Sequence, residues 1–275
     1  AETLSHRTIE TFLNIEPIHP ELERAGIPKD CLKGEVAVVT GAASNVGLGF
    51  ARAIAAAGGC VVISDINAKN GEEAQRVINE ENERDAAIFV QCDVTQEKDV
   101  KNMAEKAFEK FGKVDILLNN AMNMRLNGPI LKSSVEELDQ SYAISARGVA
   151  LAIKEFVPQM VERKHGVVTY SATQFHYSPP MVGGTVYTAG KAAATSLVMS
   201  LANELGQYNI QCIAICPGFI KTDVNRAVSD DPEFYQHITN RISAGRWGDL
   251  DDLMGTAVFL ASKASDYLNG ADIKV

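Results

Sequence analysis

The chain has 275 residues, of which 46% are hydrophobic and 22% are charged, as in an ordinary globular protein. Its formal net charge of −9 and its lack of a basic block disfavour binding to nucleic acid or to anionic membranes. No apolar run has transmembrane length, and the first residues resemble neither a signal peptide nor a transit peptide. The five cysteines show no metal-binding spacing, so we expect a cytoplasmic protein with reduced cysteines and no metal.

Residues 1–34 form a segment with three prolines and no sustained periodicity. We expect an N-terminal extension that lies on the body or on a neighbouring subunit, with a short helix near residues 8–13. From residue 35 the pattern changes, and residues 35–275 are predicted to form a single domain.

In this domain, short apolar runs alternate with longer amphipathic stretches. Strands are expected at residues 36–40, 60–63, 86–90, 114–118, 166–169 and 210–215, and helices at 46–57, 71–83, 97–111 and 135–163. Ser134 and Glu137 have the spacing of a capping box at the start of the last helix. Strand–helix alternation of this kind predicts an α/β fold, with a doubly wound, Rossmann-like parallel sheet covered by helices on both faces.

The first strand runs into a glycine-bearing turn, residues 40–49 (TGAASNVGLG), which precedes a helix. In this context the backbone N–H groups of the turn and the positive end of the helix dipole can bind phosphate. The alternative is a plain strand–helix turn without a ligand. The sequence therefore indicates a dinucleotide site.

Acidic residues follow the second and third strands. Asp65 lies 24 residues after Gly41, where a carboxylate can accept hydrogen bonds from ribose hydroxyls and repel a 2′-phosphate, which favours NAD over NADP. Its alternative role is to cap the next helix. For Asp93 the sequence leaves two roles open, a turn residue and a contact to the adenine of the cofactor.

Tyr187 and Lys191 stand four residues apart, so they share one helix face. At about 4 Å and an effective dielectric constant near 20, an ammonium stabilises a phenolate by roughly 4 kcal/mol, or about 3 pKa units. That interaction would bring a phenol towards the working range of a general acid or base. A YxxxK pair is common by chance, but here it opens the helix of the fifth strand–helix unit.

Together these motifs resemble the short-chain dehydrogenase/reductase superfamily over residues 32–275. The resemblance rests on residues 40–47, on 119–122 (NNAM) and on the Tyr187/Lys191 pair. It extends through Pro217, Gly218 and Thr222 to 245–248 (GRWG), 259–262 (FLAS) and 267–270 (YLNG).

The resemblance implies hydride transfer between NAD and a carbonyl or alcohol carbon. Tyr187 would exchange the proton with the substrate oxygen, Lys191 would hold the nicotinamide ribose, and Thr173, or alternatively Ser171, would hydrogen-bond the same oxygen. Ser145 would occupy the position of a proton-relay asparagine. The implied cofactor-binding residues are Gly41, Ser44, Asn45, Val46, Gly47, Asp65, Ile66, Asp93, Val94, Asn120, Ala121, Tyr187, Lys191, Pro217, Gly218, Ile220 and Thr222.

The sequence departs from the family pattern in four places. Asn45 replaces a turn glycine, although asparagine tolerates left-handed backbone geometry. Met122 replaces a second glycine and adds bulk near the site. Ser145 has less reach than asparagine, so we expect a weakened or rearranged relay. The glycine-rich tail usual in the family is missing after Asp272.

On the substrate side, the expected contacts are Met122, Gln174, His176 and Phe219, on loops at the carboxyl ends of strands. Met124, Phe175 and Met181 lie on the same loops. His176 is the polar candidate for recognising a substrate group; its alternative is a hydrogen bond to a neighbouring loop. Residues 225–247 are expected to form a mobile lid.

These features predict an NAD-dependent oxidoreductase acting on a secondary alcohol or the matching ketone, most like the sugar-acid, polyol and ketone reductases of the family. One alternative is a β-ketoacyl thioester reductase, although Asp65 and the acidic net charge disfavour it. Another is a catalytically weakened NAD-binding regulatory or interaction protein. The resemblance also implies a homotetramer or homodimer, with contacts through the helices at 135–163 and 191–205.

Overall fold

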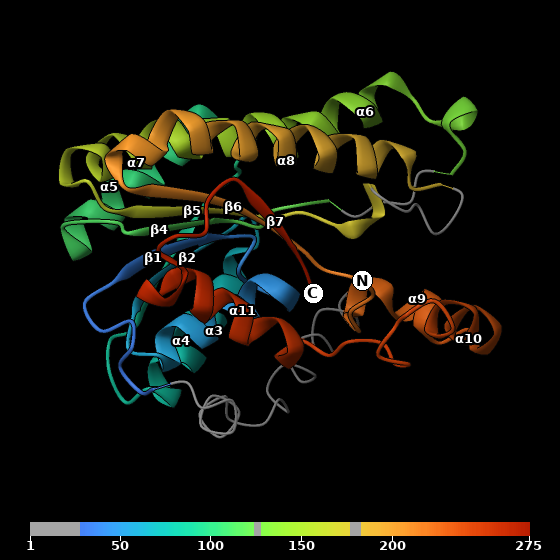
Figure 1. The fold of residues 1–275 in the computed structure, drawn as a ribbon, viewed down its shortest axis with the longest axis horizontal. Helices are drawn as coiled ribbons and strands as arrows, with labels where there is room; N and C mark the ends of the chain where they lie inside the picture. The colour runs from blue at the N-terminus through green and yellow to red at the C-terminus, as the bar shows by residue number, and fades with distance from the viewer. Residues whose placement is uncertain (1–27, 124–127, 177–182) are drawn as a thin grey trace.

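A parallel sheet of seven strands forms the centre of the computed structural model, which describes residues 28–123, 128–176 and 183–275 (Figure 1). The strand order is β3-β2-β1-β4-β5-β6-β7. The strands are β1 (Val36–Thr40), β2 (Cys60–Asp65), β3 (Ala87–Gln91), β4 (Ile116–Asn119), β5 (Gly166–Ser171), β6 (Ile210–Cys216) and β7 (Ala271–Lys274). This arrangement confirms the predicted doubly wound α/β class.

Helices cover both faces of the sheet (Figure 1). One face carries α5 (Glu97–Phe111), α7 (Gly148–Arg163) and α8 (Thr185–Leu205), and the other carries α3 (Asn45–Ala56), α4 (Ala68–Glu81) and α11 (Asp251–Ala261). Every residue of β1, β5 and β6 is buried. Buried on both faces, these strands are apolar almost throughout rather than alternating, which is the pattern that predicted them.

Helix ends match the predictions to within a few residues. The second predicted helix begins at Ala68 rather than at residue 71, because Asn67 caps it by accepting a hydrogen bond from the backbone N–H of Asn70 (3.1 Å). The predicted capping box of Ser134 and Glu137 is confirmed at the start of α6 (Val135–Tyr142). A π-helical turn, η2 (Ala143–Arg147), separates α6 from α7 within the span predicted as one helix.

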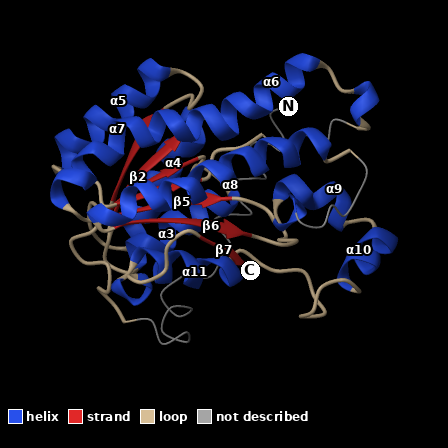
Figure 2. Cartoon of the chain, turned by 45° about the horizontal axis from the view of Figure 1, so that its top comes forward, coloured by secondary structure: helices blue, strands red, loops and turns tan. Residues whose placement is uncertain are grey.

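Three parts of the C-terminal third were not predicted as helices or strands: α11, β7 and the helices within residues 225–247. β7 is four residues long and mixes apolar with charged side chains, so it gives no apolar run, yet it pairs with β6. The segment expected as an aperiodic lid contains α9 (Arg226–Ser229) and α10 (Pro232–Thr239), which lie to one side of the sheet (Figure 2). Asp231 and Pro232, a cap followed by proline at the first helical position, were the sequence signal for α10.

The described part of the N-terminal segment packs on the domain. Leu32 is buried, and its backbone N–H donates to the carbonyl oxygen of Ala57 (2.9 Å). The helix expected at residues 8–13 lies outside the described residues. All five cysteines are free, and three of them are buried. Among the described residues, no helix is both long enough and apolar enough to cross a membrane.

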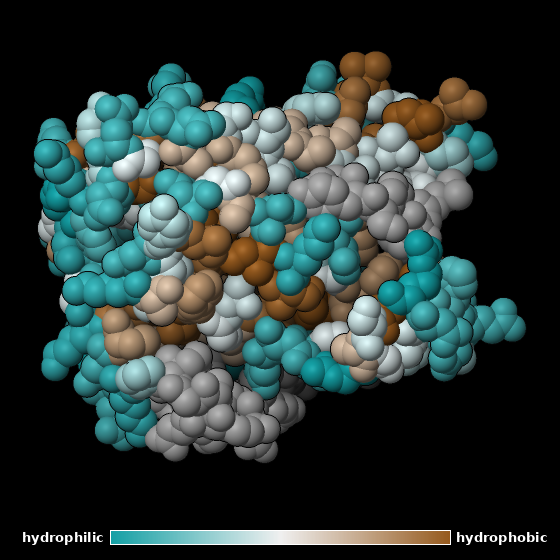
Figure 3. Space-filling view, in the orientation of Figure 1, coloured by the Kyte–Doolittle hydropathy of each residue, from teal (hydrophilic) through white to brown (hydrophobic). Residues whose placement is uncertain are grey.

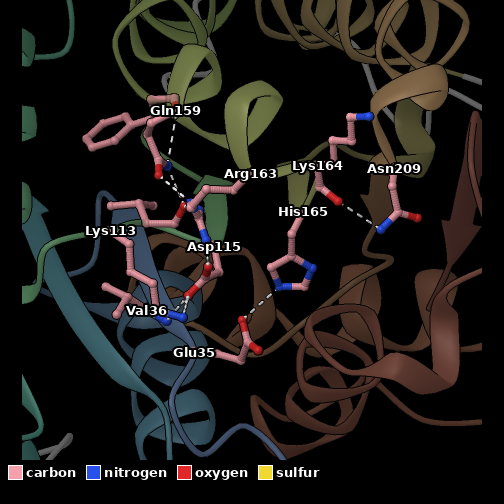
Figure 4. Close-up of polar contacts among 11 residues, drawn as sticks. Glu35, Val36, Lys113, Asp115, Gln159, Arg163, Lys164, His165 and Asn209 are labelled. Atoms are coloured by element: carbon pink, nitrogen blue, oxygen red, sulfur yellow. Dashed lines mark hydrogen bonds and ion pairs between the residues drawn. The ribbon is translucent and has the colours of Figure 1, made fainter.

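A polar cluster closes the edge of the sheet where the strands begin (Figure 4). Asp115 is fully buried and pairs with Arg163 (2.5 Å) and Lys113 (2.8 Å), and it also accepts from the backbone N–H of Val36 (2.9 Å). Burial favours the neutral acid, but the hydrogen bonds from Lys113 and Arg163 outweigh it and hold the Asp115 pKa below its usual value. Asp115 therefore fastens the starts of β1 and β4 to α7.

Glu35 and His165 lie beside Asp115, and ligand atoms of the three lie within 4.8 Å of one another. His165 pairs with Glu35 (3.1 Å), while both Asp115 oxygens are already bound by cationic side chains. The geometry is that of a structural ion-pair network.

Asp115→Asn is expected to lower the free energy of unfolding by about 2–4 kcal/mol, because the amide leaves a buried network without its charge. Urea unfolding near pH 7 measures this loss. Glu109→Gln is the control, since Glu109 pairs with Lys106 (2.8 Å) on the exposed surface and should leave stability unchanged. Equal losses in the two variants would contradict the role of Asp115.

Candidate active site

The glycine turn after β1 is tightly packed. Gly41 has a φ of +63°, and a Cβ at Gly47 would lie 2.2 Å from the Gly41 carbonyl oxygen. The side-chain amide of Asn120 donates to the carbonyl oxygens of Thr40 (3.2 Å) and Gly41 (3.1 Å), and the backbone N–H of Ala121 donates to Thr40 Oγ1 (3.1 Å). The NNAM segment after β4 thus holds the turn in place.

The N-terminus of α3 opens from this turn. Ser44 is its N-cap residue but makes no side-chain capping bond, so its hydroxyl satisfies none of the first N–H groups of the helix. A helix start of this kind, preceded by a tight glycine turn, fits the phosphates of a dinucleotide. Val46, in the first turn of α3, packs against the hydrophobic core that α3 shares with β1 and α11.

Asn45 adopts the left-handed backbone conformation that asparagine tolerates in place of a turn glycine, with a φ of +48°. Its side-chain oxygen accepts from the backbone N–H of Asp223 (3.2 Å). Glycine could not make this bond. Asn45 therefore links the glycine turn to the segment after β6, where Thr222 precedes the short helix η5 (Asp223–Asn225).

Asp65 ends β2 beside the turn. Its carboxylate accepts from the backbone N–H groups of Ala43 (3.1 Å) and Asn67 (3.0 Å). The alternative role as helix cap is wrong, because Asn67 caps α4. The carboxylate therefore lies between the turn after β1 and the start of α4, next to Ile66, which is 65% exposed.

Asp93 forms a turn after β3. Its carboxylate accepts from the backbone N–H (2.9 Å) and the hydroxyl (2.8 Å) of Thr95, and its own N–H donates to Asp99 (3.2 Å). Of the two roles left open, the structure shows the turn residue; an adenine contact stays a prediction. Val94 is buried next to Gly148 at the start of α7.

Tyr187 and Lys191 lie one turn apart near the start of α8, and both are buried against β5. The Lys191 ammonium lies 5.9 Å from the centroid of the Tyr187 ring and donates to the carbonyl oxygen of Ser171. The Thr173 side chain lies close enough to the Tyr187 phenol to lower its pKa. Thr173 thus lies beside Tyr187, and its preference over Ser171 as the hydroxyl that binds the substrate oxygen stays a prediction.

The electrostatics differ from the sequence prediction. Burial raises the pKa of Tyr187 to about 12, against a smaller lowering by the Thr173 side chain. Burial also lowers the pKa of Lys191 to about 7. The expected lowering of the phenol pKa is therefore wrong, because burial penalises the phenolate more than the contact with Thr173 stabilises it.

Ser145 lies in the π-helical turn, buried, and approaches the hydroxyl of Tyr170 on β5. Tyr170 itself is completely buried among the core residues on this face of the sheet.

The segment after β6 packs against the loop that follows β5. A Cβ at Gly218, which follows Pro217, would lie 2.2 Å from the Gln174 amide nitrogen, and Ile220 is buried. Phe219 packs against Phe175 (4.8 Å between centroids) and Trp247 (5.0 Å).

The remaining residues near this loop are a further aromatic contact and the other predicted substrate contacts. Tyr235 of α10 stacks on Trp247 (5.3 Å between centroids), a contact that sequence reasoning missed. Met122 is 38% exposed. The backbone of His176 ends η3 (Gln174–His176), but its side chain, Met124 and Met181 lie outside the described parts of the chain.

Lys191→Met is expected to flatten the pH dependence of stability between pH 7 and 8.5. In this range Lys191 is largely neutral in the folded protein and protonated in the unfolded chain, so the unfolded state binds more protons and the free energy of unfolding rises with pH. The methionine variant loses up to about 1.4 kcal/mol per pH unit of that slope. Urea unfolding at several pH values measures it, and parallel curves for the two proteins would refute the burial effect.

The sequence is similar to those of known oxidoreductases. Residues 41–275 match the family model described as enoyl-(acyl carrier protein) reductase. An uncharacterized oxidoreductase, YgcW, of Escherichia coli strain K12 is 37% identical over 242 residues, covering 87% of this chain and 90% of the relative. The 5-keto-D-gluconate 5-reductase of the same strain is 32% identical over 240 residues, covering 87% and 92%.

Solved structures share the fold and part of the sequence. A gluconate 5-dehydrogenase from Burkholderia cenocepacia J2315, in complex with NADP and tartrate, superposes with a TM-score of 0.83 at 31% identity, covering 89% of this chain and 94% of that one. An NAD+-bound xylitol dehydrogenase gives 0.81 at 26% identity, covering 89% and 98%. The chain belongs to the short-chain dehydrogenase/reductase superfamily.

Proposed function

We propose that the protein is an NAD(H)-dependent oxidoreductase that interconverts a secondary alcohol and a ketone on a sugar acid or polyol. The observation that carries this is the grouping of Thr173, Tyr187 and Lys191 at the edge of the sheet that also holds the glycine turn. A hydroxyl, a phenol and an amine next to a dinucleotide site are the groups that carbonyl reduction needs.

In this proposal the chain's own residues handle the proton. The nicotinamide supplies or accepts the hydride when bound. The Tyr187 phenol gives its proton to the carbonyl oxygen during reduction and takes it back during oxidation. The Thr173 hydroxyl, which lies beside that phenol, donates its one proton in a hydrogen bond to the same carbonyl oxygen. Lys191, when protonated, stabilises the phenolate that results.

Asp65 supports NAD as the cofactor. Both of its oxygens accept backbone N–H groups, which hold the carboxylate beside the glycine turn, and its negative charge would repel a 2′-phosphate on a bound cofactor. One solved relative holds NADP and another NAD+, so the preference proposed for this chain rests on Asp65. The other proposed cofactor contacts are those of the glycine turn, the NNAM segment and residues 217–222.

A keto sugar acid is the substrate class that we favour, since a curated relative of similar length is named for 5-keto-D-gluconate. Gln174, Met122, His176 and Phe219 are the proposed contacts. A ketoacyl thioester is the second candidate, because the matching family model is described by an acyl-carrier reaction. The net charge of −9 disfavours docking of an acidic carrier.

We further propose that the protein is a homotetramer or homodimer. Large apolar side chains are exposed over η1 (Ile130–Lys132) and α6, where apolar surface gathers in Figure 3. Leu131 is 96% exposed and Val135 is 69% exposed. Clustered apolar exposure of this kind is typical of a protein–protein contact, and α6 opens the helical span predicted to form one.

Tyr187→Phe is expected to reduce turnover by a factor of about 10²–10⁴, because the ring stays while the proton donor is lost. NADH oxidation followed at 340 nm measures the rate, and NADH fluorescence shows that cofactor binding persists. Tyr267→Phe removes a hydroxyl from a fully exposed ring and serves as the control. Undiminished turnover in Tyr187→Phe would eliminate this mechanism.

The wild-type chain is expected to use NADH with a higher kcat/KM than NADPH. Asp65→Asn should narrow that preference about tenfold or more, because the amide oxygen can still accept an N–H while the negative charge is gone. The ratio of kcat/KM for the two cofactors is the measurement. Equal use of both by the wild type would contradict the role of Asp65.

A further inference from the structure

Tyr170 lies directly behind the proposed catalytic residues. It belongs to β5, pairs with Asn119 of β4 and Ala214 of β6, and is completely buried. Its hydroxyl forms no hydrogen bond of regular geometry with the described residues, although Ser145 approaches it. A buried hydroxyl without a hydrogen-bond partner destabilises the fold, so hydrogen bonding by the hydroxyl does not explain why a tyrosine stands at position 170.

The Tyr170 ring offers a different interaction. The Lys191 ammonium lies 4.8 Å from the centroid of this ring, closer than the 5.9 Å to the Tyr187 ring. A cation within about 6 Å of an aromatic face is attracted by the ring's negative face, and more strongly where water is excluded. Lys191 is 1% exposed, so water is largely excluded here.

Other groups around Lys191 provide little compensation for its charge. It donates to the Ser171 carbonyl oxygen, and no carboxylate pairs with it among the described residues. The titratable groups facing it are Tyr170 from β5, Tyr187 from its own helix, and Cys216 from β6. The pKa of the Cys216 thiol is raised by burial to about 11, so it is neutral near pH 7.

We propose that Tyr170 is a positioning residue whose ring face increases the protonated fraction of Lys191 and holds the ammonium beside Tyr187. The inference rests on the proposed function for its purpose, since a neutral amine would not stabilise a phenolate. Its physical content, the charge state of Lys191, can be measured without cofactor or substrate. Burial is the main cause that lowers the Lys191 pKa to about 7, so a modest stabilisation of the ammonium changes the protonated fraction of Lys191 at neutral pH.

The test separates the ring from its hydroxyl. Urea unfolding is measured between pH 5.5 and 8.5 for the wild type, Tyr170→Phe and Tyr170→Leu, each with and without Lys191→Met. Each residue-170 background gives a pair of chains, one with Lys191 and one with Lys191→Met. The difference in unfolding free energy within a pair reports the protonation of Lys191, because the cost of a cavity left by leucine is the same in both chains. A chain carrying 3,4,5-trifluorophenylalanine at position 170 keeps the ring shape and weakens its negative face, which covers the case in which Tyr170→Leu does not fold.

In the wild type and in Tyr170→Phe, the difference in unfolding free energy between the Lys191 and Lys191→Met chains should begin to change at nearly the same pH. In Tyr170→Leu, and in the fluorinated chain to a smaller extent, it should begin about 0.5–1.5 pH units lower, because the ammonium has lost its partner. Identical onsets in all chains would overturn the proposal, as would equal shifts in Tyr170→Phe and Tyr170→Leu, which would assign the effect to the hydroxyl. A shifted onset in a chain that reduces no carbonyl would refute the proposed function alone.

Discussion

The Lys191 ammonium is enclosed between the end of β5 and two tyrosine rings, and the position of this one charge depends on the α/β framework around it. In a parallel sheet all strands end at the same edge, so the glycine turn after β1, Thr173 after β5 and the start of α8 meet there. Enclosure makes every electrostatic interaction at the site stronger, but it also penalises each charged form. The site therefore holds a neutral phenol at Tyr187 rather than an activated phenolate.

Two networks keep this edge in register. At the carboxyl end, Asn119 donates to the Thr169 carbonyl oxygen (3.2 Å) and Asn120 bonds the glycine turn, so β4 fastens its neighbours β1 and β5. At the opposite end, Asp115 ties the strand starts to α7 through Arg163. The sheet between them is apolar, so these polar contacts define how its ends are placed.

Much of this arrangement could be predicted from the sequence. Buried apolar runs located six of the seven strands, and the spacing of Tyr187 and Lys191 placed both on one helix face. What could not be predicted depends on contacts across the fold. Asn45 and Asp223 are 178 residues apart, and no local pattern announces their bond. The direction of the Tyr187 pKa shift was missed, because it follows from burial by several elements rather than from the distance to one lysine.

The account's central claim is tested most directly by an NADH oxidation assay of the wild-type chain with 5-keto sugar acids, polyol-derived ketones and ketoacyl thioesters as substrates. The account predicts reduction of at least one keto sugar acid or polyol-derived ketone, with a higher kcat/KM than for any thioester. Tight NADH binding without reduction of any carbonyl in the panel would contradict it.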